Sequence, residues 1–196
     1  MLHIVDDEEI IRDSLTWLAQ SRAIAATAYA GGTEFLAAMD RSGELDARGE
    51  CILLDVRMPD QSGVALFETL KNRGITRRRP VIFLTGHGDV PMAVDMLKNG
   101  AFDFFEKPFN DNQLMDRVLE ALQASLATGE QDAVRARLEA LSTREREVLD
   151  LILAGKMNKI IADELGISMR TVEVHRAHIF DKMNVKTAVE LARLLK

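Results

Sequence analysis

The sequence predicts a doubly wound α/β unit built on a five-stranded parallel sheet, followed by an all-α unit of four helices. In the first half, short apolar runs alternate five times with amphipathic stretches of helical spacing. That order implies parallel strands with helices on both faces of the sheet. In the second half the helical patterns continue without a strand-like run. The length of 196 residues suits two small domains.

The expected elements of the first half follow one another closely. The apolar runs that we interpret as strands are Leu2–Val5, Ala23–Tyr29, Cys51–Leu54, Pro80–Leu84 and Ala101–Phe105. The helical stretches are Glu8–Gln20, Thr33–Asp40, Val64–Asn72, Val90–Asn99 and Asn112–Ala127. Apolar residues at i, i+3 and i+4 spacing, such as Leu36 and Met39, mark helix faces that we expect to be buried.

The second half begins with a sharp helix start. Ser142 is followed three residues later by Glu145, which is the pattern of a capping box. The four helical patterns are Thr143–Ala154, Asn158–Leu165, Met169–Lys182 and Thr187–Leu195. We therefore expect a first domain at 1–128, a polar linker at 129–140 that is rich in helix formers and is expected to be helical, and a second domain at 141–196.

Composition and charge are those of an ordinary globular protein, with 47% hydrophobic and 29% charged residues. Residues 1–128 carry a net charge of −7 and residues 129–196 a net charge of +1, so we expect two different tasks. No apolar run is long enough to span a bilayer, and Met1 leads directly into a strand without a secretory signal. The single cysteine, Cys51, reads as a buried strand thiol. We expect a cytoplasmic protein.

Polar residues follow four of the predicted strands. They are Asp6 and Asp7 after the first strand, Asp55 after the third, Thr85 after the fourth and Lys107 after the fifth. In a flavodoxin-like sheet of order 2-1-3-4-5, the first and third strands are neighbours, so the three carboxylates meet at one edge. Such a cluster persists only with a compensating cation, and oxygen ligands favour Mg²⁺ (or Mn²⁺). A carboxylate beside that ion can attack phosphorus.

This pattern of acidic residues, hydroxyl and lysine resembles the receiver domain of two-component response regulators, and Thr85–Val94 is similar to FixJ-type receivers. The resemblance implies that Asp55 is the phosphoacceptor and that Asp6, Asp7, Asp55 and the main-chain carbonyl of Arg57 hold the metal. It further implies that Lys107 stabilises the phosphoryl group and that Thr85 and Phe104 form a conformational switch. The side chains of Arg57 and His87 are expected to tune the lifetime of the phosphoryl group. Asp89 is expected to cap the helix that follows.

The second half has the pattern of a helix-turn-helix, because Asn158–Leu165 and Ser168–Met183 are joined by a short turn at Gly166. On a helical wheel, Val172, Ile179 and Met183 form the core face of the second helix. The opposite face carries small and polar residues, which suits either a solvated surface or the DNA major groove.

The segments Leu141–Leu149 and Thr171–His175 resemble the LuxR/FixJ-type helix-turn-helix, and the whole chain is similar to FixJ/NarL-family regulators. The resemblance implies base contacts by Glu173, Val174 and Ala177. The candidates for phosphate contacts are Lys159, Arg170, Thr171, Arg176 and Lys182. Glu173 departs from many LuxR-type helices, which carry Lys there. A carboxylate at that position weakens binding unless it accepts a hydrogen bond from a cytosine amino group.

The function expected from this resemblance is transcriptional regulation in a phosphorelay, without turnover as an enzyme. The expected partners are a sensor histidine kinase, double-stranded promoter DNA, RNA polymerase and a second copy of the chain after phosphorylation, with no membrane. Two other classes are weighed. A phospho-aspartate phosphatase usually has a second acid two residues after its nucleophile, where this chain has Arg57. A phosphorylation-independent regulator usually lacks an acid or the lysine, and all are present here.

Overall fold

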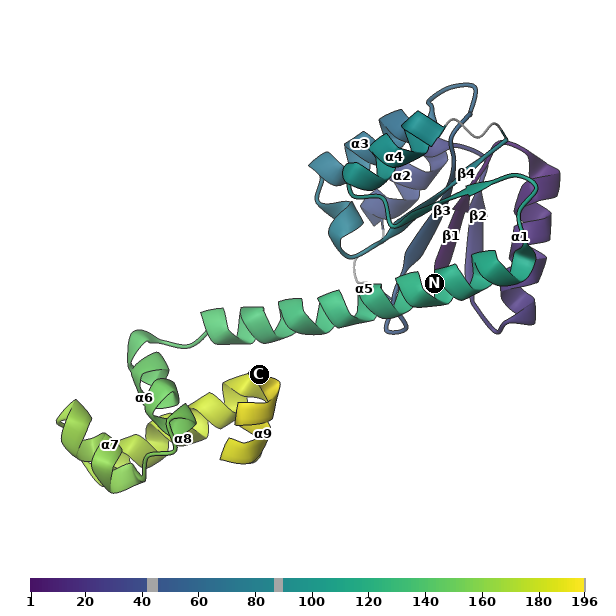
Figure 1. The fold of residues 1–196 in the computed structure, drawn as a ribbon. Helices are drawn as coiled ribbons and strands as arrows, with labels where there is room; N and C mark the ends of the chain where they lie inside the picture. The colour runs from purple at the N-terminus through teal and green to yellow at the C-terminus, as the bar shows by residue number, and fades with distance from the viewer. Residues whose placement is uncertain (42–45, 87–89, 196) are drawn as a thin grey trace. The chain divides into compact units, whose positions relative to one another are not determined.

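The computed structural model describes residues 1–41, 46–86 and 90–195, and these divide into two compact units, Met1–Gly129 and Glu130–Lys196. The strands of the first unit are β1 (Leu2–Val5), β2 (Ala26–Tyr29), β3 (Cys51–Asp55), β4 (Val81–Thr85) and β5 (Asp103–Glu106). They form a five-stranded parallel sheet in the order β2-β1-β3-β4-β5 (Figure 1). The predicted fold class and strand order are confirmed.

Helices cover both faces of this sheet (Figure 1). Their bounds are α1 (Glu9–Ser21), α2 (Gly32–Arg41), α3 (Gly63–Asn72), α4 (Val90–Lys98) and α5 (Asp111–Glu139), with a 3₁₀ turn η1 (Ile75–Arg77) before β4. Buried residues of α1 and α5 pack on one face of the sheet, and those of α2, α3 and α4 pack on the other. Among the described residues, no helix combines the length and the apolar character that crossing a membrane requires.

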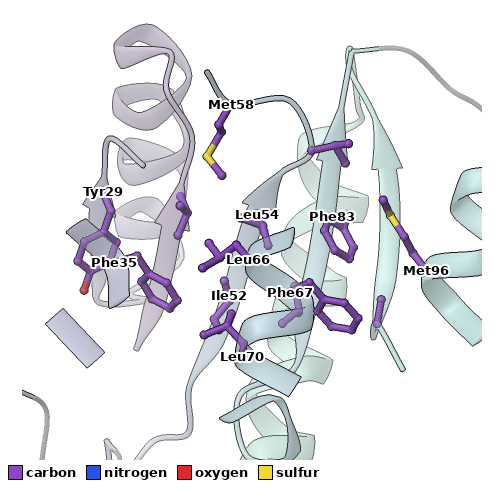
Figure 2. Packing of buried hydrophobic residues seen from close by; sticks show 14 of the residues in the cluster. Tyr29, Phe35, Ile52, Leu54, Met58, Leu66, Phe67, Leu70, Phe83 and Met96 are labelled. Carbon is purple, nitrogen blue, oxygen red and sulfur yellow. The ribbon is translucent and has the colours of Figure 1, made fainter. Parts of the chain in front are cut away.

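The core of the first unit lies on either side of β3, whose five residues are all buried. Figure 2 shows the cluster beneath α2, α3 and α4, in which Phe67 of α3 meets Phe83 of β4 edge to face, with ring centroids 5.3 Å apart. A central strand of a parallel sheet is covered on both faces, which explains its continuous apolar sequence. This packing fixes the ends of β1, β3 and β4, where the polar residues follow.

Three strands begin later than the sequence predicts: β4 by a single residue, and β2 and β5 by more. Ala23 lies in the left-handed region with φ of 57°, and the amide of Ile24 donates to the carbonyl of Ala19, so these residues end α1 instead of starting β2. Likewise the amide of Ala101 donates to the carbonyl of Met96 and belongs to the end of α4. Apolar helix ends and apolar strand starts look alike in a sequence. The predicted helix cap at Asp89 and the predicted role of His87 lie outside the described residues.

The second unit contains α6 (Thr143–Leu153), α7 (Asn158–Leu165), α8 (Met169–Met183) and α9 (Ala188–Leu194). The capping box is confirmed, because Ser142 accepts from the amide of Glu145 and the Glu145 carboxylate accepts from the amide of Ser142. Residues 130–139 continue α5, and Val134 and Leu138 pack against the core of this unit. The segment interpreted as a linker is thus helical through Glu139, and two of its residues contact the second core.

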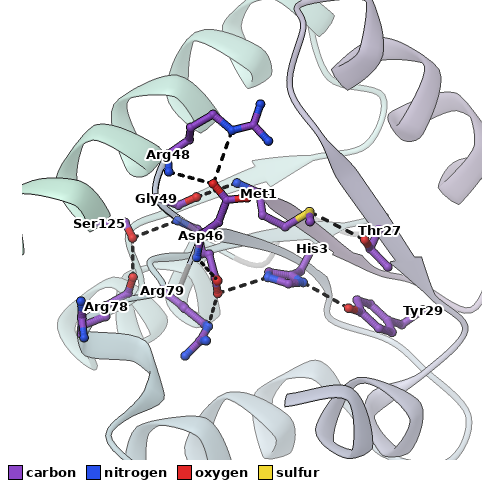
Figure 3. A network of polar contacts seen from close by, with 11 residues as sticks. Met1, His3, Thr27, Tyr29, Asp46, Arg48, Gly49, Arg78, Arg79 and Ser125 are labelled. Atoms are coloured by element: carbon purple, nitrogen blue, oxygen red, sulfur yellow. Dashed lines mark hydrogen bonds and ion pairs between the residues drawn. The ribbon is translucent and has the colours of Figure 1, made fainter. Parts of the chain in front are cut away.

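A buried polar network lies in the first unit around the start of β1 and β3 (Figure 3). Its centre is Glu50, which is 5% exposed and accepts hydrogen bonds from the amide of Asp46 and from the Nε of Arg79. His3 lies with Nε2 at 3.3 Å from Glu50 Oε2 and with Nδ1 at 3.2 Å from the hydroxyl of Tyr29. These contacts link β1 and β2 to the segments that lead into β3 and β4.

Candidate functional site

The acidic cluster lies where the strands of the sheet end. Asp6 directly follows β1, Asp55 is the last residue of β3, and these two strands are neighbours. Lys107 follows β5, and its Nζ lies 2.7 Å from Asp6 Oδ2 and 2.7 Å from Asp55 Oδ1. Both carboxylates are buried, with Asp55 only 5% exposed. The ammonium group thus holds two carboxylates from different strands at one point.

The other carboxylate oxygens of this pair are fixed by the main chain. Asp55 Oδ2 accepts a hydrogen bond of 2.7 Å from the amide of Arg57, and Asp6 Oδ1 accepts one of 2.9 Å from the amide of Glu8. Asp7, in contrast, is exposed. Each buried carboxylate is therefore oriented by one ammonium contact and one backbone contact, as expected for buried charged groups.

The charges of the site influence each other's protonation. Burial raises the pKa of the Asp55 carboxyl, and Asp6 acts in the same direction, while the hydrogen bond from Lys107 opposes both without cancelling them. Burial by itself would lower the pKa of the Lys107 ammonium, but its hydrogen bonds to Asp55 and Asp6 outweigh that effect and raise it. Lys107 therefore stays protonated at neutral pH and remains available to an anionic group.

Thr85 lies on β4, which neighbours the strand of Asp55, and Phe104 lies on β5, which neighbours β4. Thr85 is the last residue of β4 and is buried, and its carbonyl accepts a hydrogen bond of 2.6 Å from the amide of Lys107. Phe104 pairs in register with Phe83 of β4, is partly buried, and packs against the core cluster beneath α4. The fold thus brings Thr85 to the same edge as Asp55, with Phe104 on the next strand.

The donor set of this edge fits Mg²⁺. That ion prefers oxygen ligands, is often held by one or two carboxylates, and keeps several waters. In the described parts of the chain, no three His, Cys, Asp or Glu side chains lie close enough to hold a metal together. Asp6 and Asp55, joined through Lys107, are the carboxylate pair that is already assembled.

The face of α8 opposite the core is open. Val172, Ile179 and Met183 are fully buried, which confirms the core face predicted from the helical wheel. The exposed residues of this helix include Arg170, Glu173, Val174, Ala177, His178 and Asp181, and Val174 is 47% exposed. The side chain of Ser168 caps the start of the helix by accepting from the amide of Thr171.

The five candidates for phosphate contacts differ in their surroundings. Lys159 on α7 and Arg170 on α8 are exposed. The Thr171 hydroxyl lies 2.8 Å from that of Ser168, and the Arg176 guanidinium lies 5.4 Å from the ring centroid of Phe180. Lys182 donates to the buried carboxylate of Glu145 at 2.7 Å and to the carbonyl of Ala140 at 3.2 Å. An ammonium has three donors, so Lys182 keeps one for a phosphate.

Two residues near the acidic site were not identified from the sequence. Arg12 of α1 donates to the carbonyls of both Asp6 and Asp7. A Cβ on Gly63, the first residue of α3, would lie 2.0 Å from the carbonyl oxygen of Asp55. The signal for Arg12 was its place as the first basic residue in an acidic stretch. A glycine at a helix start gives no comparable signal, because the close approach depends on tertiary structure.

Comparisons with known proteins identify the family of each unit. Residues 2–119 match the response regulator receiver domain family, and residues 139–195 match the luxR family of bacterial regulatory proteins. The chain is 50% identical to the C4-dicarboxylate transport transcriptional regulatory protein DctR of Rhodobacter capsulatus, over 98% of both chains. It is 43% identical to the transcriptional regulatory protein FixJ of Rhizobium meliloti, covering 98% of this chain and 93% of that one.

Two solved full-length structures are similar to this chain over both of its units. The response regulator StyR matches 99% of this chain and 96% of its own, with a TM-score of 0.71 and 35% identity. Full-length FixJ from B. japonicum matches 98% of this chain and 94% of its own, with a TM-score of 0.58 and 38% identity. The fold is that of a receiver domain followed by a LuxR-type DNA-binding domain. The chain belongs to the FixJ/NarL-like response regulators, a family of transcriptional regulators.

Proposed function

We propose that this regulator is phosphorylated on Asp55 by a sensor histidine kinase and then dimerises and binds promoter DNA. The observation that supports it most is the contact of the Lys107 ammonium with both Asp55 and Asp6. Receiver domains generally bind Mg²⁺ at their acidic pocket. Here the carboxylates of Asp6, Asp7 and Asp55 and the carbonyl of Arg57 would hold it. Bound there, the ion would offset the negative charge of phosphoryl oxygens.

The chemical step proposed for Asp55 is an in-line displacement at phosphorus. A carboxylate oxygen of Asp55 attacks the phosphorus of a phosphohistidine on the kinase, a P–O bond forms and the P–N bond breaks. The imidazole takes up one proton and leaves as neutral histidine. Lys107 compensates the charge of the phosphoryl group, and the hydroxyl of Thr85 donates to one of its oxygens. Thr85 then moves toward the phosphoryl group, and Phe104 turns inward.

Labelling with a small phosphodonor tests the assignment of Asp55. Wild-type protein incubated with acetyl phosphate and Mg²⁺ is expected to gain one phosphoryl group by intact mass and to sediment as a dimer. Asp55→Asn is expected to gain none, whereas Asp60→Asn, which changes an exposed Asp of the same loop, is expected to label like wild type. Asp7→Ala is expected to lose Mg²⁺ binding and labelling together. A phosphoryl group on Asp55→Asn would show that another residue is the acceptor.

In this proposal, phosphorylation of the receiver raises the affinity for DNA through dimerisation. A dimer presents two copies of α8 to two half-sites, so the second contact becomes intramolecular and can raise avidity by about 10²–10⁴. The exposed face of α8 supports its placement in the major groove, because the face is made of small and polar side chains. RNA polymerase is the further partner of a promoter-bound regulator. Within α8, we assign base contacts to Glu173, Val174 and Ala177.

A selection from randomised DNA separates base recognition from phosphate contacts. Glu173→Ala is expected to change the preferred base at one position, with a loss of about 1–3 kcal/mol of discrimination, because a carboxylate pairs with the cytosine amino group. Lys159→Ala is expected to weaken binding to all sequences alike and to reduce the salt slope by about one. Asp150→Ala removes an exposed acid on α6, so it controls for the change of net charge in Glu173→Ala. An unchanged preference for Glu173→Ala contradicts the proposed orientation of α8.

A further inference from the structure

The guanidinium of Arg12 lies beside the main chain of the acidic dipeptide. Its Nη1 donates to the carbonyl of Asp6 at 2.8 Å and to the carbonyl of Asp7 at 2.8 Å. Arg12 lies in the first turns of α1, where its own amide donates to the carbonyl of Glu8. One side chain thus spans the connection between β1 and α1. We propose that Arg12 is a positioning residue that holds Asp6 and Asp7 in the geometry that binds the metal ion.

This role rests on the proposed function, because it concerns the residues assigned to Mg²⁺. Asp6 and Asp7 depend on Arg12 to different degrees. Asp6 is buried, its amide donates to the carbonyl of Tyr29, and its carboxylate accepts from Glu8 and Lys107. Asp7 is exposed, and within the described ranges its side chain takes part in no hydrogen bond or ion pair. The contact that fixes the Asp7 peptide group is the one from Arg12.

The start of α1 lacks the usual side-chain cap. Glu8 occupies the N-cap position, but its side chain makes no capping hydrogen bond. The turn is instead closed by the carboxylate of Asp6, which accepts from the amide of Glu8, and by Arg12 reaching back from the helix. Without Arg12, the peptide group that carries the Asp7 carbonyl would lose its anchor, and the direction of the Asp7 carboxylate would be less restricted.

The chemistry of arginine suits this task. The guanidinium is planar, stays charged at any physiological pH, and presents its N–H groups in a fixed fork. The positive charge also lies beside the first two of four consecutive acids, Asp6 to Glu9, and reduces the repulsion among them. A lysine keeps the charge but replaces the fork by a rotating ammonium, so it can restore only part of the effect.

Metal binding to the full-length protein tests the proposal without any phosphodonor. Free Mn²⁺ is measured by electron paramagnetic resonance during titration of wild type, Arg12→Ala, Arg12→Lys and Arg22→Ala. Arg22 follows the end of α1 and pairs with Asn112 and Asp116 of α5. Arg22→Ala therefore removes one positive charge and its side-chain contacts, as Arg12→Ala does. Groups that hold metal ligands in place typically contribute 10- to 100-fold to affinity, so Arg12→Ala is expected to raise the Kd about ten-fold.

The control Arg22→Ala is expected to keep the wild-type Kd, and Arg12→Lys is expected to lie between wild type and Arg12→Ala. Excess Mg²⁺ is expected to restore labelling of Arg12→Ala by acetyl phosphate. An Arg12→Ala protein with a lower thermal midpoint but a wild-type Kd overturns the positioning role, as does an Arg12→Lys protein no better than Arg12→Ala. If wild type itself binds no Mn²⁺, the metal site of the proposed function is overturned instead.

Discussion

Gly63→Ala is expected to abolish most of the stability of the receiver unit. A Cβ at this position would lie 2.0 Å from the carbonyl oxygen of Asp55 and 3.1 Å from the Cα of Val56, and both are backbone atoms that no rotamer change can move. The amide of Gly63 also donates to the carbonyl of Val56 at 2.9 Å, so the start of α3 is held against the end of β3. We expect a loss on the order of 3–5 kcal/mol, which is exceptional for one methyl group.

The tryptophan and tyrosine bands of near-ultraviolet circular dichroism measure this loss in the receiver unit alone. The chain has one Trp and one Tyr, and these are Trp17 and Tyr29, both in the first unit. Gly31→Ala is the matched control, because a Cβ there has nothing within 4 Å, and it is expected to stay within about 1 kcal/mol of wild type. A cooperative transition of Gly63→Ala at the wild-type midpoint would show that the loop can move aside.

Gly63 also marks the limit of what the sequence predicts about the site. The strand ends could be placed because β-then-α alternation and apolar runs are local patterns, and the parallel order follows from them. Asp6, Asp55 and Lys107 therefore could be predicted to meet. The approach of Gly63 to Asp55 could not, because it depends on how α3 packs against β3.

Contacts between side chains far apart in the sequence could not be predicted either. The resemblance to LuxR-type helices makes Lys182 a candidate for DNA phosphate contacts, and the structure adds its contact with Glu145 on another helix. Glu145 is the capping residue that the sequence predicts, but its carboxylate also lies 2.7 Å from Lys182 Nζ and 3.8 Å from His178 Nδ1, both on α8. A pattern within one helix, such as a capping box or a helical wheel, does not show which residues of another helix a side chain contacts.

Glu50→Ala is expected to be the second strongly destabilising substitution in the receiver unit. The carboxylate is buried, and it is the shared partner of the Arg79 guanidinium, of His3 Nε2 and of the Asp46 amide (Figure 3). Arg79 and His3 are themselves only 13% and 7% exposed in their side chains, so both would be left buried without a charged partner. Removing one member of a buried pair typically costs about 3–5 kcal/mol.

The stability lost in Glu50→Ala is expected to become smaller as the pH falls. Burial by itself would raise the pKa of the Glu50 carboxyl, but hydrogen bonds from His3, the Asp46 amide and Arg79 outweigh burial and lower the pKa from 4.5 to about 2. The folded state thus holds the charged form more strongly than the unfolded chain does. The contribution of Glu50 is complete above pH 4.5 and is lost as the pH falls toward about 2.

Urea unfolding followed by the near-ultraviolet signal of Trp17 and Tyr29 tests both statements. That probe excludes the second unit, where the pKa of Glu145 is also lowered to about 2 and would give a similar acid response. The difference in unfolding free energy between wild type and Glu50→Ala is expected to shrink as the pH is lowered below 4.5. Glu68→Ala, which removes an exposed carboxylate from α3, is expected to show a small difference at every pH. A difference for Glu50→Ala that stays constant through this range would mean that the loss comes from packing and not from the charge of the carboxylate.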